Sequence, residues 1–238
     1  MDQYWVDSEL RVDRAQIWQQ QSQVRTTQAF IAKLSLACLR SPIRREIMDW
    51  LRERSDELLT CSRTFQLAVS LFDLFHVQNS TAEIADLLAI AAAALMAAVN
   101  TLERFEISAE YVSRLPHIAG SASEIASLQY LLLARIDWVL DLPTASDIIQ
   151  YFCTALIDTP AKEKWEQWAD RCYQQSSMRF GPFTIAVAGC QALGGAVPAV
   201  AYSQEAVTAL LEEAGQVDSV EGDRLDSTFS SSPDRPNK

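Results

Sequence analysis

The stretch SPIRREIMDWL, residues 41–51, contains the signals that decide how this part of the chain folds. Ser41 stands before Pro42, an order typical of a helix start. A serine side chain can accept a hydrogen bond from the first free N–H groups, and a proline has no N–H to leave unpaired. We therefore expect a helix from residue 42 to about residue 54. Arg44 and Arg45 stand among its large apolar side chains, which raises the question of what their charges do.

Helical patterns dominate the rest of the sequence, and no stretch alternates apolar and polar residues over a useful length. The fold class predicted is therefore all-α. Residues 65–77 are apolar almost all round, with Ser62 or Thr64 as a possible cap, and residues 80–100 are rich in alanine, so we expect both helices to be central. The other helices are expected at 12–39 (one or two), 107–115, 121–140, 145–157, 161–176, 183–197 and 203–214.

A break in the helical pattern occurs at DLPTAS, residues 141–146. Pro143 ends the preceding helix, and Thr144 or Ser146 can cap the next one, so we place the domain junction here. Residues 217–238 are polar and contain proline, with few large apolar side chains, and they are expected to be disordered.

Composition and charge exclude several classes of function. The net charge is -11 and the pI is about 4.6, which argues against a nucleic-acid partner or an anionic membrane surface. The five cysteines are scattered and form no CxxC pair, which favours a reducing compartment, the nucleus or the cytoplasm. No pattern for a nucleophile and base, a phosphate loop, a cofactor or a metal site occurs, so we expect no enzyme, no cofactor and no metal.

Several stretches resemble the motifs of the cyclin family, and they follow one another in the family's order. IRREIMDWL resembles the cyclin-box signature M-R-x-I-L-x-D-W-L, and LAVSLFDLF resembles L-A-x-x-L-x-D-R-F-L. ALMAAVN falls where the family's third helix ends. The stretch LQYLLLARIDWVLDLPTASDII resembles the fifth helix running into the second box, and GPFTIAVAGCQALGGAV is similar to a small-residue helix of D-type and viral cyclins.

This resemblance implies a cyclin-like fold of two tandem helical boxes. The segments expected are an N-terminal helical extension (1–40), a first box (41–142), a second box (143–216) and a disordered tail (217–238). The second box is short, so both a complete and a truncated box stay open.

The resemblance also assigns a role to Arg44. It places Arg44 and Asp73 on consecutive helices that pack together, where they would form a structural ion pair. Asp73 lies in an otherwise apolar helix, where an unpaired carboxylate would be costly. The alternative is a solvated arginine, the role that we expect for Arg45, with Asp49 one turn away.

The stripe of Ile43, Ile47 and Trp50 has two interpretations. In cyclins the corresponding stripe forms a groove that docks short Arg-x-Leu peptides, and Glu53 matches the family's acidic position. The alternative is ordinary core packing. Glu46 stands where the family has an apolar residue, so both interpretations stay open.

In the family, the third and fifth helices contact the kinase through a lysine and a glutamate. Aligning the motifs places Asn100 and Gln129 at these positions, so both charges are lost. Neutral hydrogen bonds are weaker than charge-assisted ones. A shift of the alignment by one or two residues would bring Glu103 or Glu124 to the contact instead.

The function that the resemblance implies is a non-catalytic regulatory subunit that binds a cyclin-dependent protein kinase and stabilises its active αC-helix placement. Such a subunit would control the cell cycle. A cyclin-like scaffold or adaptor that activates no kinase is the alternative, and the lost charges favour it. Ser232, which precedes Pro233, is a candidate phosphorylation site in the tail.

Overall fold

The computed structural model describes residues 42–78, 84–138, 140, 142–152, 159–176, 180–192 and 204–212. No strand occurs within these ranges, and the predicted all-α fold is confirmed. The helices are α4 (Pro42–Glu57), α5 (Ser62–Gln78), α6 (Ile84–Leu102), α7 (Ala109–Val112), α8 (Ala122–Arg135), α9 (Ala145–Phe152), α10 (Thr159–Ser176) and α11 (Pro182–Ala192). Residues 204–212 are helical as well.

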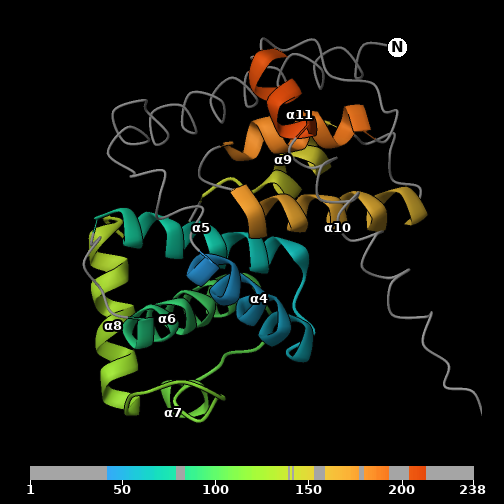
Figure 1. Cartoon of the computed structure of the whole chain (residues 1–238). Coiled ribbons are helices and arrows are strands. Elements are labelled where there is room, and N and C mark those ends of the chain that lie inside the picture. The colour runs from blue at the N-terminus through green and yellow to red at the C-terminus, as the bar shows by residue number, and fades with distance from the viewer. Residues whose placement is uncertain are drawn as a thin grey trace, which may run out of the picture.

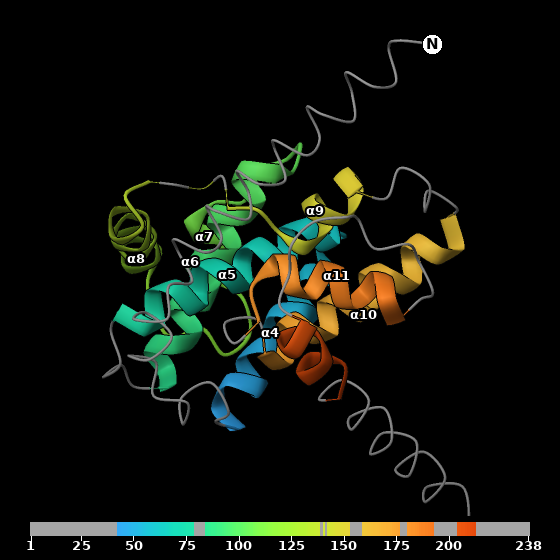
Figure 2. The same cartoon turned by 90° about the horizontal axis from the view of Figure 1, so that it is seen from above.

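The helices form two sets that meet along α5 (Figure 1). The first set consists of α4 to α8 and the second of α9 to α11. Both α9 and α10 pack against α5, and α10 also packs against α4. At the other side of the first set, α8 stands at the edge of the molecule in both views, packed on α6 and α7 (Figures 1 and 2).

Helix α6 is the centre of the first set, as its alanine-rich sequence predicts. Its side chains from Ala91 to Val99 are all buried, and it packs against α4, α5, α7 and α8. Small side chains let the backbones of neighbouring helices approach closely, so one helix can serve four partners. Helix α5 is also central, since it packs against both sets.

Three helix starts follow local capping chemistry. The Ser108 hydroxyl accepts a hydrogen bond from the N–H of Tyr111 at the start of α7, as predicted. Ser121 and Glu124 form a capping box at the start of α8. At α9 the Asp147 N–H donates to the Thr144 hydroxyl (3.2 Å), and the Thr144 N–H donates to the Asp147 carboxylate (3.0 Å). Of the two caps proposed for α9, Thr144 is therefore the one used.

The start of α5 differs from the prediction. The Ser62 and Thr64 hydroxyl groups donate to Asp170 and Glu103 instead of capping the helix. Glu103, which follows the end of α6, accepts hydrogen bonds from the Cys61 N–H (3.0 Å) and the Thr64 hydroxyl (2.6 Å). A carboxylate from a distant part of the sequence thus stabilises the N-terminus of α5, where the helix dipole favours negative charge.

Helix α8 ends at Arg135, earlier than its apolar pattern suggests. Asp137 and Trp138 have φ values of 52° and 59°, in the left-handed region. The Trp138 N–H donates to the Leu133 carbonyl (2.8 Å), a bond that closes the helix end as in a Schellman motif. The chain therefore turns back on itself before Pro143 is reached.

Several predictions lie outside the described residues. They concern the extension at 1–40, the cap at Ser41, residues 80–83, the ends of the helices expected near 157 and 197, and the tail with Ser232.

Candidate functional site

The first candidate feature is the pair of Arg44 on α4 and Asp73 on α5. The Arg44 Nε and Nη2 donate to the two carboxylate oxygens of Asp73 at 3.0 and 2.7 Å. The pair is bidentate, and the side chains are only 5% and 1% exposed. The ion pair expected from the sequence is therefore present in the structure.

Arg44 has a further role that the sequence did not reveal. Its Nη1 donates to the Gln174 carbonyl (2.5 Å), and its Nη2 donates to the Tyr173 carbonyl (3.2 Å). These carbonyls belong to the last turn of α10, whose final carbonyl groups have no partner within the helix. A cation at a helix C-terminus is also favoured by the helix dipole. One guanidinium thus joins α4 and α5 of the first set to α10 of the second.

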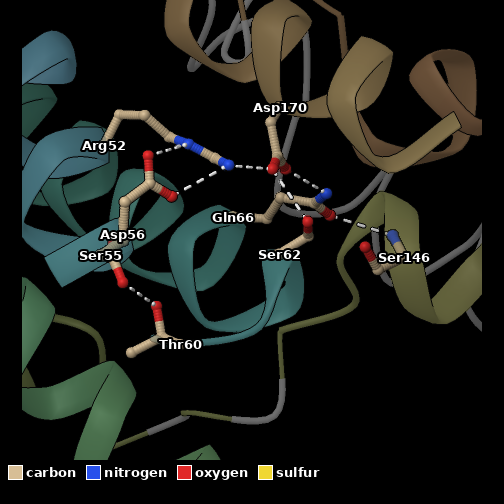
Figure 3. A network of polar contacts seen from close by, with 8 residues as sticks. All are labelled: Arg52, Ser55, Asp56, Thr60, Ser62, Gln66, Ser146 and Asp170. Atoms are coloured by element: carbon tan, nitrogen blue, oxygen red, sulfur yellow. Dashed lines mark hydrogen bonds and ion pairs between the residues drawn. The ribbon is translucent and has the colours of Figure 1, made fainter. Parts of the chain in front are cut away.

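A second polar cluster surrounds Asp170 on α10 (Figure 3). Its carboxylate is buried and accepts hydrogen bonds from Arg52, from the Ser62 hydroxyl (2.9 Å) and from the Gln66 amide (2.9 Å). The Gln66 carbonyl oxygen in turn accepts from the Ser146 N–H in α9 (3.0 Å). The donors come from α4 and α5, so this cluster also connects the two sets.

The environment of Asp170 perturbs its ionisation. Burial raises the pKa of Asp170, and the hydrogen bonds from Gln66 and Ser62 and the charge of Arg52 offset this effect only in part. Because structural networks also perturb pKa values, we assign Asp170 to the connection between the sets and not to catalysis.

The residues expected in a peptide-docking groove are mostly inside the protein. Ile47 and Trp50 are buried in the core, and Ile43 is half-buried. The Trp50 indole N–H donates to the Pro116 carbonyl (3.2 Å). Glu46 and Glu53 are exposed on the other side of α4. The core-packing interpretation describes Ile47 and Trp50, and the structure offers no accessible apolar stripe at these positions.

Asn100, expected at the kinase contact, lies at the end of α6 and is held by its own chain. Its Nδ2 donates to the Ile107 carbonyl (3.1 Å), and its Oδ1 accepts from the Ile107 N–H (2.8 Å). Both atoms of the amide are therefore used to hold the connection between α6 and α7. The side chain is exposed but already has its partners.

The alternative contact residues are also partly occupied. Glu103 stabilises the start of α5. Burial acts to raise the pKa of Glu103, but the hydrogen bonds from Thr64 and Cys61 outweigh it, so the pKa lies below its ordinary value. Glu124 belongs to the capping box of α8, while Gln129 is half-buried in the same helix.

An apolar surface that the sequence analysis missed lies at the C-terminal end of α8. Tyr130, Leu131 and Trp138 are 64%, 42% and 56% exposed, and we call these three residues the α8 patch. The Tyr130 and Trp138 rings meet edge to face, with their centroids 5.4 Å apart. An apolar run of this kind was interpreted only as a motif match. The signal that could have revealed the patch is its breadth, because α8 buries fully only Ile125 and Leu132.

Two searches of the described residues gave no further site. They contain no group of His, Cys, Asp or Glu side chains that could hold a metal ion. Among the described helices, none combines the length and apolar character that crossing a membrane requires.

Comparison with known proteins decides the family. A family model of the cyclin N-terminal domain matches residues 14–141, more than half of the chain. The chain belongs to the cyclin family. Its fold resembles that of a viral cyclin from herpesvirus saimiri, with a TM-score of 0.57 and 15% sequence identity. The match covers 72% of this cyclin and 85% of the viral chain. A search of curated protein sequences found no match.

Membership of this family gives a coarse function. Cyclins are regulatory proteins, and this chain is a cyclin-like regulator. The matched region includes α4 to α8, so the Arg44 pair, Asn100 and the α8 patch all lie within the cyclin domain.

Proposed function

We propose that this cyclin binds a cyclin-dependent protein kinase through the edge formed by α6 and α8 and holds the kinase αC helix in its active position. The proposal places the complex in the nucleus or the cytoplasm, where it would control progression through cell division. A partner that binds only the active arrangement shifts the kinase equilibrium by its differential affinity for the two states.

The observation that carries this proposal is the exposed apolar face of α8. Cyclins bind kinases through the helices that correspond to α6 and α8, and these two helices pack side by side here. The α8 patch leaves three large apolar side chains in contact with solvent at this edge. Exposed aromatic residues are typical of the centres of protein interfaces.

A scaffold or adaptor that does not activate a kinase is the second candidate. The observation that favours it is the state of Asn100, whose amide is bonded to Ile107 and carries no charge. Without the family's charged contact, binding can persist while the αC helix is not held in place.

The two candidates differ in one experiment. The full chain is immobilised and mixed with a panel of cyclin-dependent kinases, and each retained kinase is assayed on a histone or retinoblastoma-type substrate. The proposal expects retention of at least one kinase and a rise in its activity. Retention without a rise would establish the adaptor, and no retention would refute both kinase hypotheses.

A second experiment tests the position of the lost charge. Gln129→Glu restores the acidic side chain on α8, where Gln129 is half-buried. We expect stronger activation of the retained kinase. Asn100→Lys is a poorer test, because it removes the two hydrogen bonds to Ile107.

Docking of short Arg-x-Leu peptides is not included in the proposal. The burial of Ile47 and Trp50 leaves these side chains little surface for a peptide.

A further inference from the structure

The polar residues at the edge of α6 and α8 have structural roles within the chain. Asn100 uses both amide atoms on Ile107, and Glu103 accepts hydrogen bonds from Cys61 and Thr64. Glu124 accepts bonds from Ser121 at the start of α8. A partner that approached this edge would therefore meet side chains whose hydrogen-bonding capacity is largely used.

The α8 patch is different, because its side chains are exposed and held in place. The edge-to-face contact of Tyr130 with Trp138 restricts both rings. The bond from the Trp138 N–H to the Leu133 carbonyl fixes the backbone that carries the indole. Side chains that are ordered before binding lose less conformational entropy in the complex.

The backbone at Trp138 adds a second observation. A bulky residue with a positive φ is uncommon, and here Asp137 and Trp138 are both in the left-handed region. Such residues cost about 1 to 3 kcal/mol each and are concentrated at functional sites. The fold thus keeps an indole on the surface, beside Tyr130, in a conformation that ordinary helix ends avoid.

The charge around the patch indicates what kind of surface it fits. Arg135 and Asp137 are both exposed next to the patch, and their charges are opposite. Gln129, directly before Tyr130, is neutral. The patch therefore presents aromatic and aliphatic groups without a net charge, which complements an uncharged apolar surface.

We infer that this cyclin recognises its kinase through the α8 patch, which contacts an uncharged apolar surface of the kinase, and not through the charge-assisted hydrogen bonds of the family. The inference rests on the proposed function. It goes further in naming the residues that supply the affinity and the kind of surface that they select. It also gives the interaction a low sensitivity to salt, because salt screens exposed charges and leaves apolar contacts in place.

The test uses the full chain and the kinase that it retains best. Affinity is measured by calorimetry for the wild type, Leu131→Glu and Trp138→Ala. Leu59→Glu is the matched control, because Leu59 is 88% exposed in the turn between α4 and α5 and receives the same change as Leu131. Circular dichroism and the thermal midpoint check that each variant is folded.

We expect Leu131→Glu and Trp138→Ala to weaken binding by about tenfold or more, as truncation of a central interface residue does. Leu59→Glu should stay within about twofold of the wild type, as residues outside an interface do. Raising NaCl from about 50 mM to about 500 mM should weaken wild-type binding by less than about threefold, since few exposed charges take part.

The inference is overturned if folded Leu131→Glu and Trp138→Ala bind as the wild type does, or if affinity falls steeply with salt. Either result would leave the proposed function standing. If the wild type retains no kinase, the proposed function fails and the inference fails with it.

Discussion

Arg44 shows at the scale of one residue why the cyclin-box arginine is buried. It makes a bidentate pair with Asp73 and two further bonds to carbonyl groups of α10. A buried ion needs such a complete set of partners, because its desolvation would otherwise exceed the attraction of the pair. The question raised by the two arginines in SPIRREIMDWL is thus answered for Arg44, while Arg45 is exposed.

Removing Asp73 should therefore be costly. We expect Asp73→Ala to lower the free energy of unfolding by about 3 to 5 kcal/mol, because Arg44 is left buried with part of its partners missing. Urea unfolding measures the loss. Lys162→Ala is the control, since it removes an exposed pair with Glu166 in α10 and should cost less than about 1 kcal/mol. Similar losses for both variants would contradict the role given to Arg44.

Asp170 and Glu103 should give opposite dependences of stability on pH. Burial raises the pKa of Asp170, so its contribution is present below its ordinary value of 3.8 and is lost as pH rises through the folded-state pKa. For Glu103, burial is outweighed by hydrogen bonds that lower the pKa. Its contribution is present above its ordinary value of 4.5 and is lost as pH falls through the folded-state pKa.

The measurement is urea unfolding of the wild type, Asp170→Asn and Glu103→Gln between about pH 3 and about pH 8. The stability of the wild type relative to Asp170→Asn should decrease as pH rises. Relative to Glu103→Gln it should increase. Two slopes of the same sign would show that one of these environments is wrong.

At the scale of the elements, the contact of α10 with α11 depends on a residue without a side chain. A Cβ atom added to Gly189 would overlap the indole Nε1 of Trp165 and crowd Trp168. All three residues are buried, and the helices lie too close for a larger residue. The small-residue sequence around Gly189 thus has a packing role.

Gly189→Ala should destabilise the protein by about 1 to 3 kcal/mol, the usual cost of overpacking. The thermal midpoint would measure this loss. Trp165→Phe removes the overlapping atom, so the double variant should be more stable than the sum of the two changes predicts. Simple additivity would show that the overlap is relieved in another way.

Local signals in the sequence were sufficient for most helix starts. Ser108 and Thr144 cap their helices because such caps involve residues that are close in the sequence. The cap of α5 could not be predicted in this way, since Glu103 reaches it from the end of α6. The early end of α8 was also missed, because its apolar pattern continues past Arg135 while the backbone does not.

The candidate site was predictable to a smaller extent. The resemblance brought Arg44 and Asp73 together correctly, but their contacts with α10 depend on how the two sets pack. It could not show that Asn100 is bonded to Ile107, because a motif gives positions and not partners. Exposure of the α8 patch is likewise a property of the folded surface.

At the scale of the whole molecule, buried polar side chains connect the two helical sets. Gln66 is fully buried and bridges Asp170 in α10 with the Ser146 N–H in α9. An ion pair of Arg63 with Asp147 (2.6 Å) joins α5 and α9 nearby. Hydrogen bonds of this kind are directional, so they determine one relative orientation of the sets more strictly than apolar contact alone.

Gln66→Leu keeps the volume but removes both bonds, which leaves a carboxylate oxygen and an N–H without a partner. We expect a loss of about 1 to 3 kcal/mol. Hydrogen exchange should become faster in α9 and α10 than in α6. Ser127→Ala is the control, because it removes a bond within α8 only. Equal exchange throughout the chain would contradict a connecting role for Gln66.

The bonds between Arg44 and α10 have a consequence for dividing the protein. A fragment that stopped at Pro143 would keep Asp73 opposite Arg44, but it would lack the Tyr173 and Gln174 carbonyls. The guanidinium would then be short of acceptors at a surface stripped of its covering helix. The proline that separates the sets in the sequence is thus a poor place to cut the chain, and each set completes the fold of the other.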